Sequence, residues 1–137
     1  MKIEEAIHKV VNSPEVKAIV KELRKDYDWW GWTQGGCYAF AEALVEAFPD
    51  ATLWVIAEKE KESEDWPSHH AFVKYHGRFY DATGRRTRKD LKAPFTDCIV
   101  KIGEVENWPD KWPVWYPQQE FVSLEQIELI TEKLRVA

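Results

Sequence analysis

The chain has 137 residues, a formal net charge of −5, 45% hydrophobic residues and 14% aromatic residues. This composition excludes intrinsic disorder, and the length predicts a single domain spanning residues 1–137. The acidic balance argues against nucleic acid as a partner, because phosphate binding needs a surplus of lysine and arginine. No segment reads as a signal peptide or a membrane span, so we expect a soluble, cytoplasmic protein without a membrane partner.

Three helices are expected at the start of the chain. Apolar side chains recur at helical spacing over residues 2–12, and a second helix begins after Ser13, a residue type typical of an N-cap. A loop rich in tryptophan and glycine follows at residues 28–36. The third helix is expected over residues 37–48, before Pro49, and its many apolar positions predict that it is central and mostly buried.

A small antiparallel sheet is expected next. β-rich runs predict strands at residues 52–57, 70–75, 78–82 and 98–105. The basic run at residues 85–92 predicts a solvated surface, and Ser123 with Gln126 forms the capping box of a closing helix to about Arg135. Helices, then antiparallel strands, then a last helix indicate an α+β fold.

Cys37 has the surroundings of a candidate nucleophile. Gly35 and Gly36 precede it directly, and it begins the expected third helix. The unpaired N–H groups and the positive dipole end at a helix start favour a thiolate, the form that attacks a carbonyl carbon. The structural alternative is a packed core thiol, which is the role we expect for Cys98 at the start of an apolar strand.

The expected hairpin places a histidine beside an aspartate. If residues 76–77 form a two-residue turn, Tyr75 faces Arg78, and His70 and Asp81 become diagonal neighbours on one face of the sheet. Diagonal residues lie about 7–8 Å apart at Cα, which allows a carboxylate to reach an imidazole nitrogen. One further residue in the turn would reverse the parity and separate the two side chains.

Three segments carry a resemblance to a known family. Gly-Gly-Cys-Tyr-Ala-Phe-Ala at residues 35–41 resembles the nucleophile segment of transglutaminase-like proteins. His-Ala-Phe-Val at residues 70–73 and Tyr-Asp-Ala-Thr at residues 80–83 resemble the histidine and aspartate strands of that family. The glutamine usual before the cysteine is Gly36 here, and the histidine-to-aspartate interval is short. These departures point to a minimal relative, closer to small cysteine peptidases and amidases than to cross-linking enzymes.

The resemblance implies a papain-like, transglutaminase-like core in which the cysteine-bearing helix packs on a small antiparallel sheet. This core covers about residues 28–105, with N-terminal helices before it and the closing helix after it. By matching position, the resemblance implies Cys37 as nucleophile, His70 as base and Asp81 as the acid that orients the histidine. Strand alternation directs His69 to the opposite face, so it is not the expected base.

Further site residues are expected around the glycine loop. Gln34 and Gly36 are candidate donors to an oxyanion, and Trp30 and Trp32 are candidate walls of the substrate cleft. The alternative for the tryptophans is ordinary packing in the core. We expect no metal site, because neither Cys-x-x-Cys nor His-Glu-x-x-His spacing occurs in the sequence.

These features together predict a thiol-dependent acyl-transfer enzyme that hydrolyses an amide or peptide bond through a thioester. It needs no cofactor, and its partner is a peptide, a protein or another amide. One alternative is a catalytically inactive transglutaminase-like binding module that uses an aromatic-rich surface. Another is a structural protein with no more than an α+β core.

Overall fold

The computed structural model describes residues 2–59, 68–95, 99–107 and 121–137. The elements of these residues are, in chain order, α1 (Lys2–Val11), α2 (Pro14–Leu23), α3 (Cys37–Ala47), β1 (Thr52–Lys59), β2 (Ser68–Tyr75), β3 (Arg78–Asp81), β4 (Gly84–Arg86), α4 (Arg88–Lys92), β5 (Ile99–Glu104), the 3₁₀ turn η1 (Val105–Asn107) and α5 (Leu124–Val136). Cys98, which was expected to be a core thiol, lies outside the described residues.

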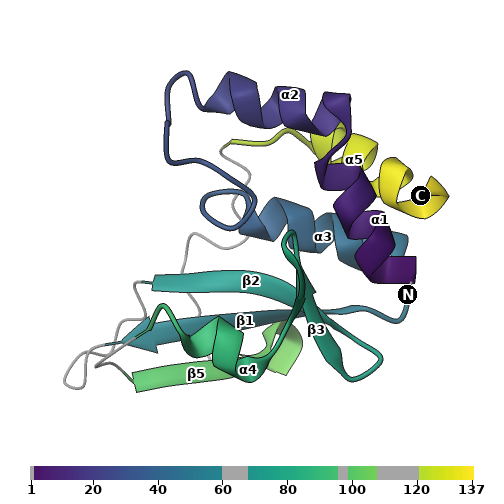
Figure 1. The fold of residues 1–137 in the computed structure, drawn as a ribbon. Coiled ribbons are helices and arrows are strands. Elements are labelled where there is room, and N and C mark those ends of the chain that lie inside the picture. The colour runs from purple at the N-terminus through teal and green to yellow at the C-terminus, as the bar shows by residue number, and fades with distance from the viewer. Residues whose placement is uncertain (1, 60–67, 96–98, 108–120) are drawn as a thin grey trace.

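The five strands form one antiparallel sheet in the order β4-β3-β2-β1-β5. Figure 1 shows α1, α2, α3 and α5 gathered above this sheet, with α3 directly over β2. The expected α+β class with a small antiparallel sheet is therefore confirmed. Among the described residues, no helix combines the length and the apolar composition that crossing a membrane requires.

Alternating side chains of β2 divide the interior into two cores. Ala71 and Val73 pack with the helices, whereas Phe72 belongs to a second cluster with Phe79 of β3 and Leu91 of α4. Successive residues of a strand point to opposite faces, so the large helices cover one face and α4 covers the other.

The residues predicted to cap the helices do so in the structure. Ser13 is the N-cap of α2, with Pro14 in the first turn, and Ser123 and Gln126 form the reciprocal capping box of α5. α3 is the central helix, and most of its side chains are buried: Tyr38, Ala39, Phe40, Ala41, Ala43 and Leu44. The prediction of a buried third helix is confirmed.

The β2–β3 hairpin has the predicted two-residue turn. Tyr75 pairs with Arg78, and both turn residues have positive φ angles, 48° for His76 and 78° for Gly77. This is the geometry whose twist matches that of the flanking strands, and glycine adopts it without a steric penalty. The turn thus fixes which residues of β2 and β3 face each other, and this register decides on which face of the sheet His70 lies.

Residues 84–92 contain two elements that were not predicted from the sequence. Gly84 starts β4, and α4 follows it. The helix forms because Thr87 and Asp90 make a capping box and because Leu91 is buried in the second core. Most side chains of this run are solvent-exposed as expected, but that of Arg86 is only 28% exposed.

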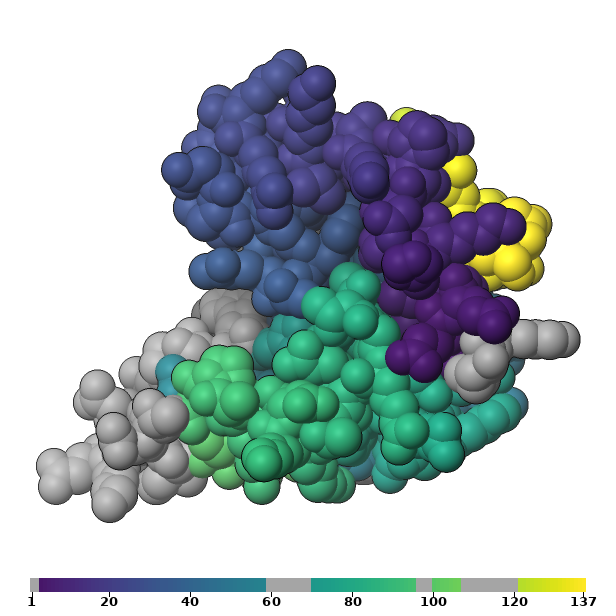
Figure 2. Space-filling view, in the orientation of Figure 1, coloured from purple at the N-terminus to yellow at the C-terminus, as the bar shows by residue number. Residues whose placement is uncertain are grey.

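The first helix is tied to the β3–β4 edge. The carboxylate of Glu4 accepts a hydrogen bond of 3.1 Å from the backbone N–H of Arg85. In the space-filling view, the dark purple surface of α1 meets the green surface of residues after 80 (Figure 2). This contact holds α1 against β4, the edge strand that follows Asp81 in the chain.

Candidate active site

The glycine loop before α3 lies directly on buried tryptophan. A Cβ atom at Gly35, where φ is +95°, would lie 2.6 Å from Cδ1 of Trp30, and one at Gly36 would lie 2.7 Å from Cζ2 of the same ring. Trp30 is fully buried, so its ring cannot move aside to make space for a Cβ atom. The two glycines are therefore required for the loop to reach the position from which Cys37 starts the helix.

Backbone hydrogen bonds close this loop. The N–H of Gly36 donates to the carbonyl of Gly31 at 3.0 Å, and Nε of Arg24 donates to the carbonyl of Trp30 at 2.7 Å. The N–H of Phe40 donates to the carbonyl of Gly36 at 3.1 Å and so begins the helical pattern. The N–H of Cys37 lies in the first turn of the helix, where backbone N–H groups have no partner within the helix itself.

His70 and Asp81 are in direct contact. Nε2 of His70 lies 3.0 Å from Oδ2 of Asp81, and the two side chains are 16% and 4% exposed. The His70 ring also stacks on the buried ring of Phe72, with centroids 6.1 Å apart. The carboxylate and the aromatic ring together fix the plane of the imidazole.

The half-buried side chain of Cys37 also acts on this imidazole, through hydrogen bonding and charge that both favour the protonated ring. Nε2 is occupied by Asp81, so Nδ1 is the ring nitrogen available to a second partner. Burial lowers the pKa of His70, but the hydrogen bonds and charges of Asp81 and Cys37 outweigh it and raise the pKa to about 9. His70 therefore holds its proton more tightly than a free imidazole does.

Asp81 is held as a carboxylate by its own hydrogen bonds. Burial raises the pKa of Asp81, but the bonds from His70 and Thr83 outweigh this effect and lower it below its ordinary value. Oδ1 accepts from the backbone N–H of Thr83 at 2.8 Å and from the hydroxyl of the same residue. An aspartate that bonds the backbone two residues ahead forms an Asx turn, and this turn ends the strand.

Two residues of the network were not identified as site residues from the sequence. Thr83 bonds Asp81, and Arg86 donates from Nη1 to the hydroxyl of Thr83 at 3.0 Å. The Asp-x-Thr spacing is a recognisable signal for the Asx turn. Arg86 has no comparable signal, because it is one of several basic residues in a run.

Three of the four remaining site residues, Gly36, Trp30 and Trp32, take other positions than expected. Gly36 is corrected as an oxyanion donor, because its N–H is already bonded to Gly31. Trp30 and Trp32 are corrected as cleft walls, because they are 0% and 8% exposed and pack edge-to-face in the core. Gln34 is solvent-exposed on the loop, three residues before Cys37, and its role as a donor stays a prediction.

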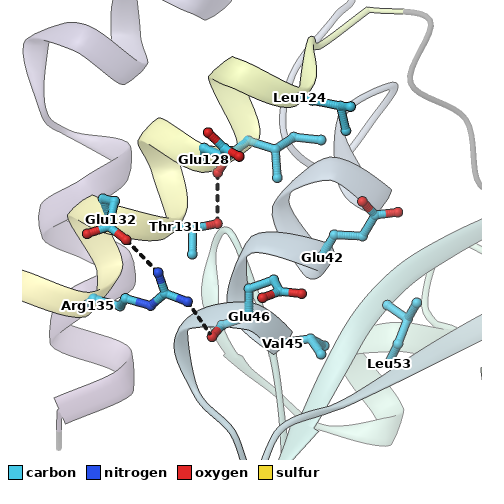
Figure 3. A pocket seen from close by; sticks show the side chains of 10 residues that line it. Glu42, Val45, Glu46, Leu53, Leu124, Glu128, Thr131, Glu132 and Arg135 are labelled. Atoms are coloured by element: carbon cyan, nitrogen blue, oxygen red, sulfur yellow. Dashed lines mark hydrogen bonds and ion pairs between the residues drawn. The ribbon is translucent and has the colours of Figure 1, made fainter.

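A groove lies away from these residues. It has a volume of about 610 Å³ and lies between α3, α5 and the start of β1, with Glu42, Leu53 and Leu124 among its lining residues (Figure 3). Cys37, His70 and Asp81 do not line it. Within the residues described, no group of three or more His, Cys, Asp or Glu side chains is arranged to hold a metal ion.

The comparisons with known proteins give one family. Residues 16–130 match the family described as Phage YunG-like protein, a span that includes the glycine loop, α3 and the whole sheet. No curated protein and no solved structure matches the chain. Because the match covers most of the chain, the protein belongs to the Phage YunG-like family.

Proposed function

We propose that the protein is a thiol-dependent acyl-transfer enzyme with a papain-like, transglutaminase-like core, and that it hydrolyses an amide or peptide bond. One observation carries the proposal. The half-buried imidazole of His70 bonds the Asp81 carboxylate, and its pKa is also raised by Cys37, the first residue of a buried helix. A packed structural thiol has no need of this arrangement.

The proposed first half-reaction forms a thioester. The thiolate of Cys37 attacks the carbonyl carbon of the amide, a carbon–sulfur bond forms, and the electron pair of the carbonyl moves to oxygen. The backbone N–H of Cys37 stabilises this oxyanion. The proton on Nδ1 of His70 then passes to the leaving amine as the carbon–nitrogen bond breaks.

The second half-reaction releases the acid. Neutral His70 takes a proton from water, the resulting hydroxide attacks the thioester carbon, and the carbon–sulfur bond breaks to return the thiolate. Asp81 stays ionised throughout and keeps Nε2 protonated, so that Nδ1 is the nitrogen that exchanges protons with the reacting groups. No cofactor takes part in these steps, and the partner is a peptide, a protein or another amide.

The alternative of an inactive binding module is favoured by one surface feature. Tyr27 and Trp29 are 41% and 47% exposed, and both pack edge-to-face against Phe121. Exposed aromatic side chains of this kind supply contact area in interfaces. A binding module of this kind requires no reactive cysteine, so acylation of Cys37 separates the two functions.

The test uses a small activated ester. We expect p-nitrophenyl acetate to release p-nitrophenol in a burst and to add one acetyl group to the folded protein, which peptide mapping assigns to Cys37. The Cys37→Ser variant should show neither the burst nor the acetyl group, because its hydroxyl is not ionised beside an imidazolium. Acetylation of Cys37 only after denaturation would contradict the proposal and support the binding module.

A further inference from the structure

The two oxygens of the Asp81 carboxylate are bonded by different partners. Oδ2 accepts from His70 at 3.0 Å, and Oδ1 accepts the backbone N–H and the hydroxyl of Thr83. A carboxylate can rotate about its bond to Cβ, and such a rotation would exchange the two oxygens or move Oδ2 away from the imidazole. The bonds to Oδ1 oppose that rotation without occupying the oxygen that His70 uses.

The Thr83 hydroxyl lies between an acceptor and a donor. The ionised carboxylate of Asp81 only accepts, so the single proton of the hydroxyl is donated to Oδ1. A guanidinium only donates, and Nη1 of Arg86 donates to the Thr83 oxygen at 3.0 Å. Arg86 thus holds the hydroxyl oxygen in the position from which its proton reaches the carboxylate.

Arg86 is itself held in place from two sides. It lies in β4, where its backbone pairs with Phe79, and its Nη2 donates to the carbonyl of Asp90 at 3.2 Å. That carbonyl belongs to α4, which the Thr87–Asp90 capping box stabilises. Nε of Arg86 lies 3.9 Å from Oδ2 of Asp81, close enough for attraction between the charges but too far for a hydrogen bond. His70 therefore keeps Oδ2 as its acceptor.

We propose that Thr83 and Arg86 are positioning residues for the active site, with Arg86 acting through the Thr83 hydroxyl to fix the Asp81 carboxylate against His70. The inference rests on the proposed function for its catalytic consequence, but the geometry it describes does not depend on substrate. The proposal gives a role to Thr83, in the turn before β4, and to Arg86, in β4 itself. It also explains why the side chain of Arg86 is only 28% exposed although the other basic side chains of the run are exposed.

The test compares four variants by the rate at which iodoacetamide alkylates Cys37 at pH 6. Thr83→Val removes the hydroxyl and keeps the volume, and we expect the rate to fall about tenfold, as the loss of a hydrogen bond to a charged group implies. Thr83→Ser keeps the hydroxyl and should restore the wild-type rate. Arg86→Gln should lower the rate, whereas Arg85→Gln, which removes the same charge one residue earlier, should leave it unchanged.

A double variant tests whether Arg86 acts through Thr83. In the Thr83→Val background there is no hydroxyl to orient, so Arg86→Gln should cause a smaller loss of rate than in the wild type, limited to the direct attraction between Arg86 and Asp81. Additive losses, or equal losses in Thr83→Ser and Thr83→Val, would overturn the inference while leaving the proposed function intact.

An NMR titration of His70 separates the inference from the proposed function. In Thr83→Val, the imidazole should lose part of its bond to Asp81 and titrate at a lower pH than in the wild type. This shift supports the positioning role even if Cys37 of the wild type is never acylated, an outcome that would contradict the proposed function alone. An unchanged His70 titration in Thr83→Val overturns the inference.

Discussion

Replacement of His70 with alanine is expected to reduce the rate at which iodoacetamide alkylates Cys37 at pH 6 by about 100-fold. An ordinary thiol is ~0.3% ionised at this pH, since its pKa is about 8.5. In the wild type, the side chain of Cys37 helps to raise the pKa of His70, and the proposed function requires the protonated ring to activate the sulfur. The alanine variant lacks this ring, so the thiol should react as an ordinary one.

His76→Ala is the matched control for this experiment. His76 also bonds an aspartate, Asp50, at 3.2 Å, but this pair is on the surface, with side chains 63% and 73% exposed. Its removal should leave the alkylation rate unchanged. Peptide mapping must assign the label to Cys37, because the chain has a second cysteine at position 98. Equal rates in the wild type and His70→Ala would show that the imidazole does not activate the thiol.

The second large effect is expected from Asp81→Asn. Asp81 is 4% exposed and pairs with the imidazole of His70, which is 16% exposed, so its loss leaves a largely desolvated charge without its counter-ion. Removing one partner of a buried ion pair costs about 3 kcal/mol of unfolding free energy. Urea unfolding monitored by circular dichroism at pH 6 measures this loss. The alkylation rate of Cys37 should fall in the same variant.

The stability loss should depend on pH in a defined direction. The pKa of His70 rises from 6.5 to about 9 in the folded protein, so folding binds a proton between these values. The stability from this charge is complete below about pH 6.5 and disappears as the pH rises through about 9. The difference between the wild type and Asp81→Asn should therefore shrink from pH 6 to pH 10.

Asp50→Asn provides the control for the buried pair. It removes the same charge from a histidine–aspartate contact of similar length, 3.2 Å, that is exposed to solvent. Exposed ion pairs contribute little to stability, so no measurable change is expected at either pH. A loss in Asp81→Asn no greater than that in Asp50→Asn would contradict the buried ion pair.

The position of His70 against Asp81 could be predicted because short-range rules determine it. Glycine at position 77 specifies the two-residue turn, the turn specifies the register, and strand alternation then brings His70 and Asp81 to one face. The start of α3 at Cys37 could likewise be predicted, because the two glycines directly before it mark the end of the loop. These features depend on residues close in the sequence or paired through one hairpin.

The role of Trp30 could not be predicted, because it depends on packing between distant elements. A tryptophan in a glycine-rich loop fits equally well as a cleft wall or as a core residue, and only the folded loop shows that its ring supports Gly35 and Gly36. The same limit applies to Arg86. Its partners, Thr83 and Asp90, are set by how β4 and α4 pack, which no local pattern in the basic run specifies.

The most direct test of the account is an NMR titration of the His70 imidazole in the wild type and in Cys37→Ala. The account places Cys37 and Asp81 on the two sides of one ring, and both raise its pKa to about 9. We therefore expect a pKa near 9 in the wild type and a clearly lower value in Cys37→Ala, which loses the bond and the charge of the sulfur. A wild-type pKa near the ordinary value of about 6.5, or a value that Cys37→Ala does not change, would contradict the account.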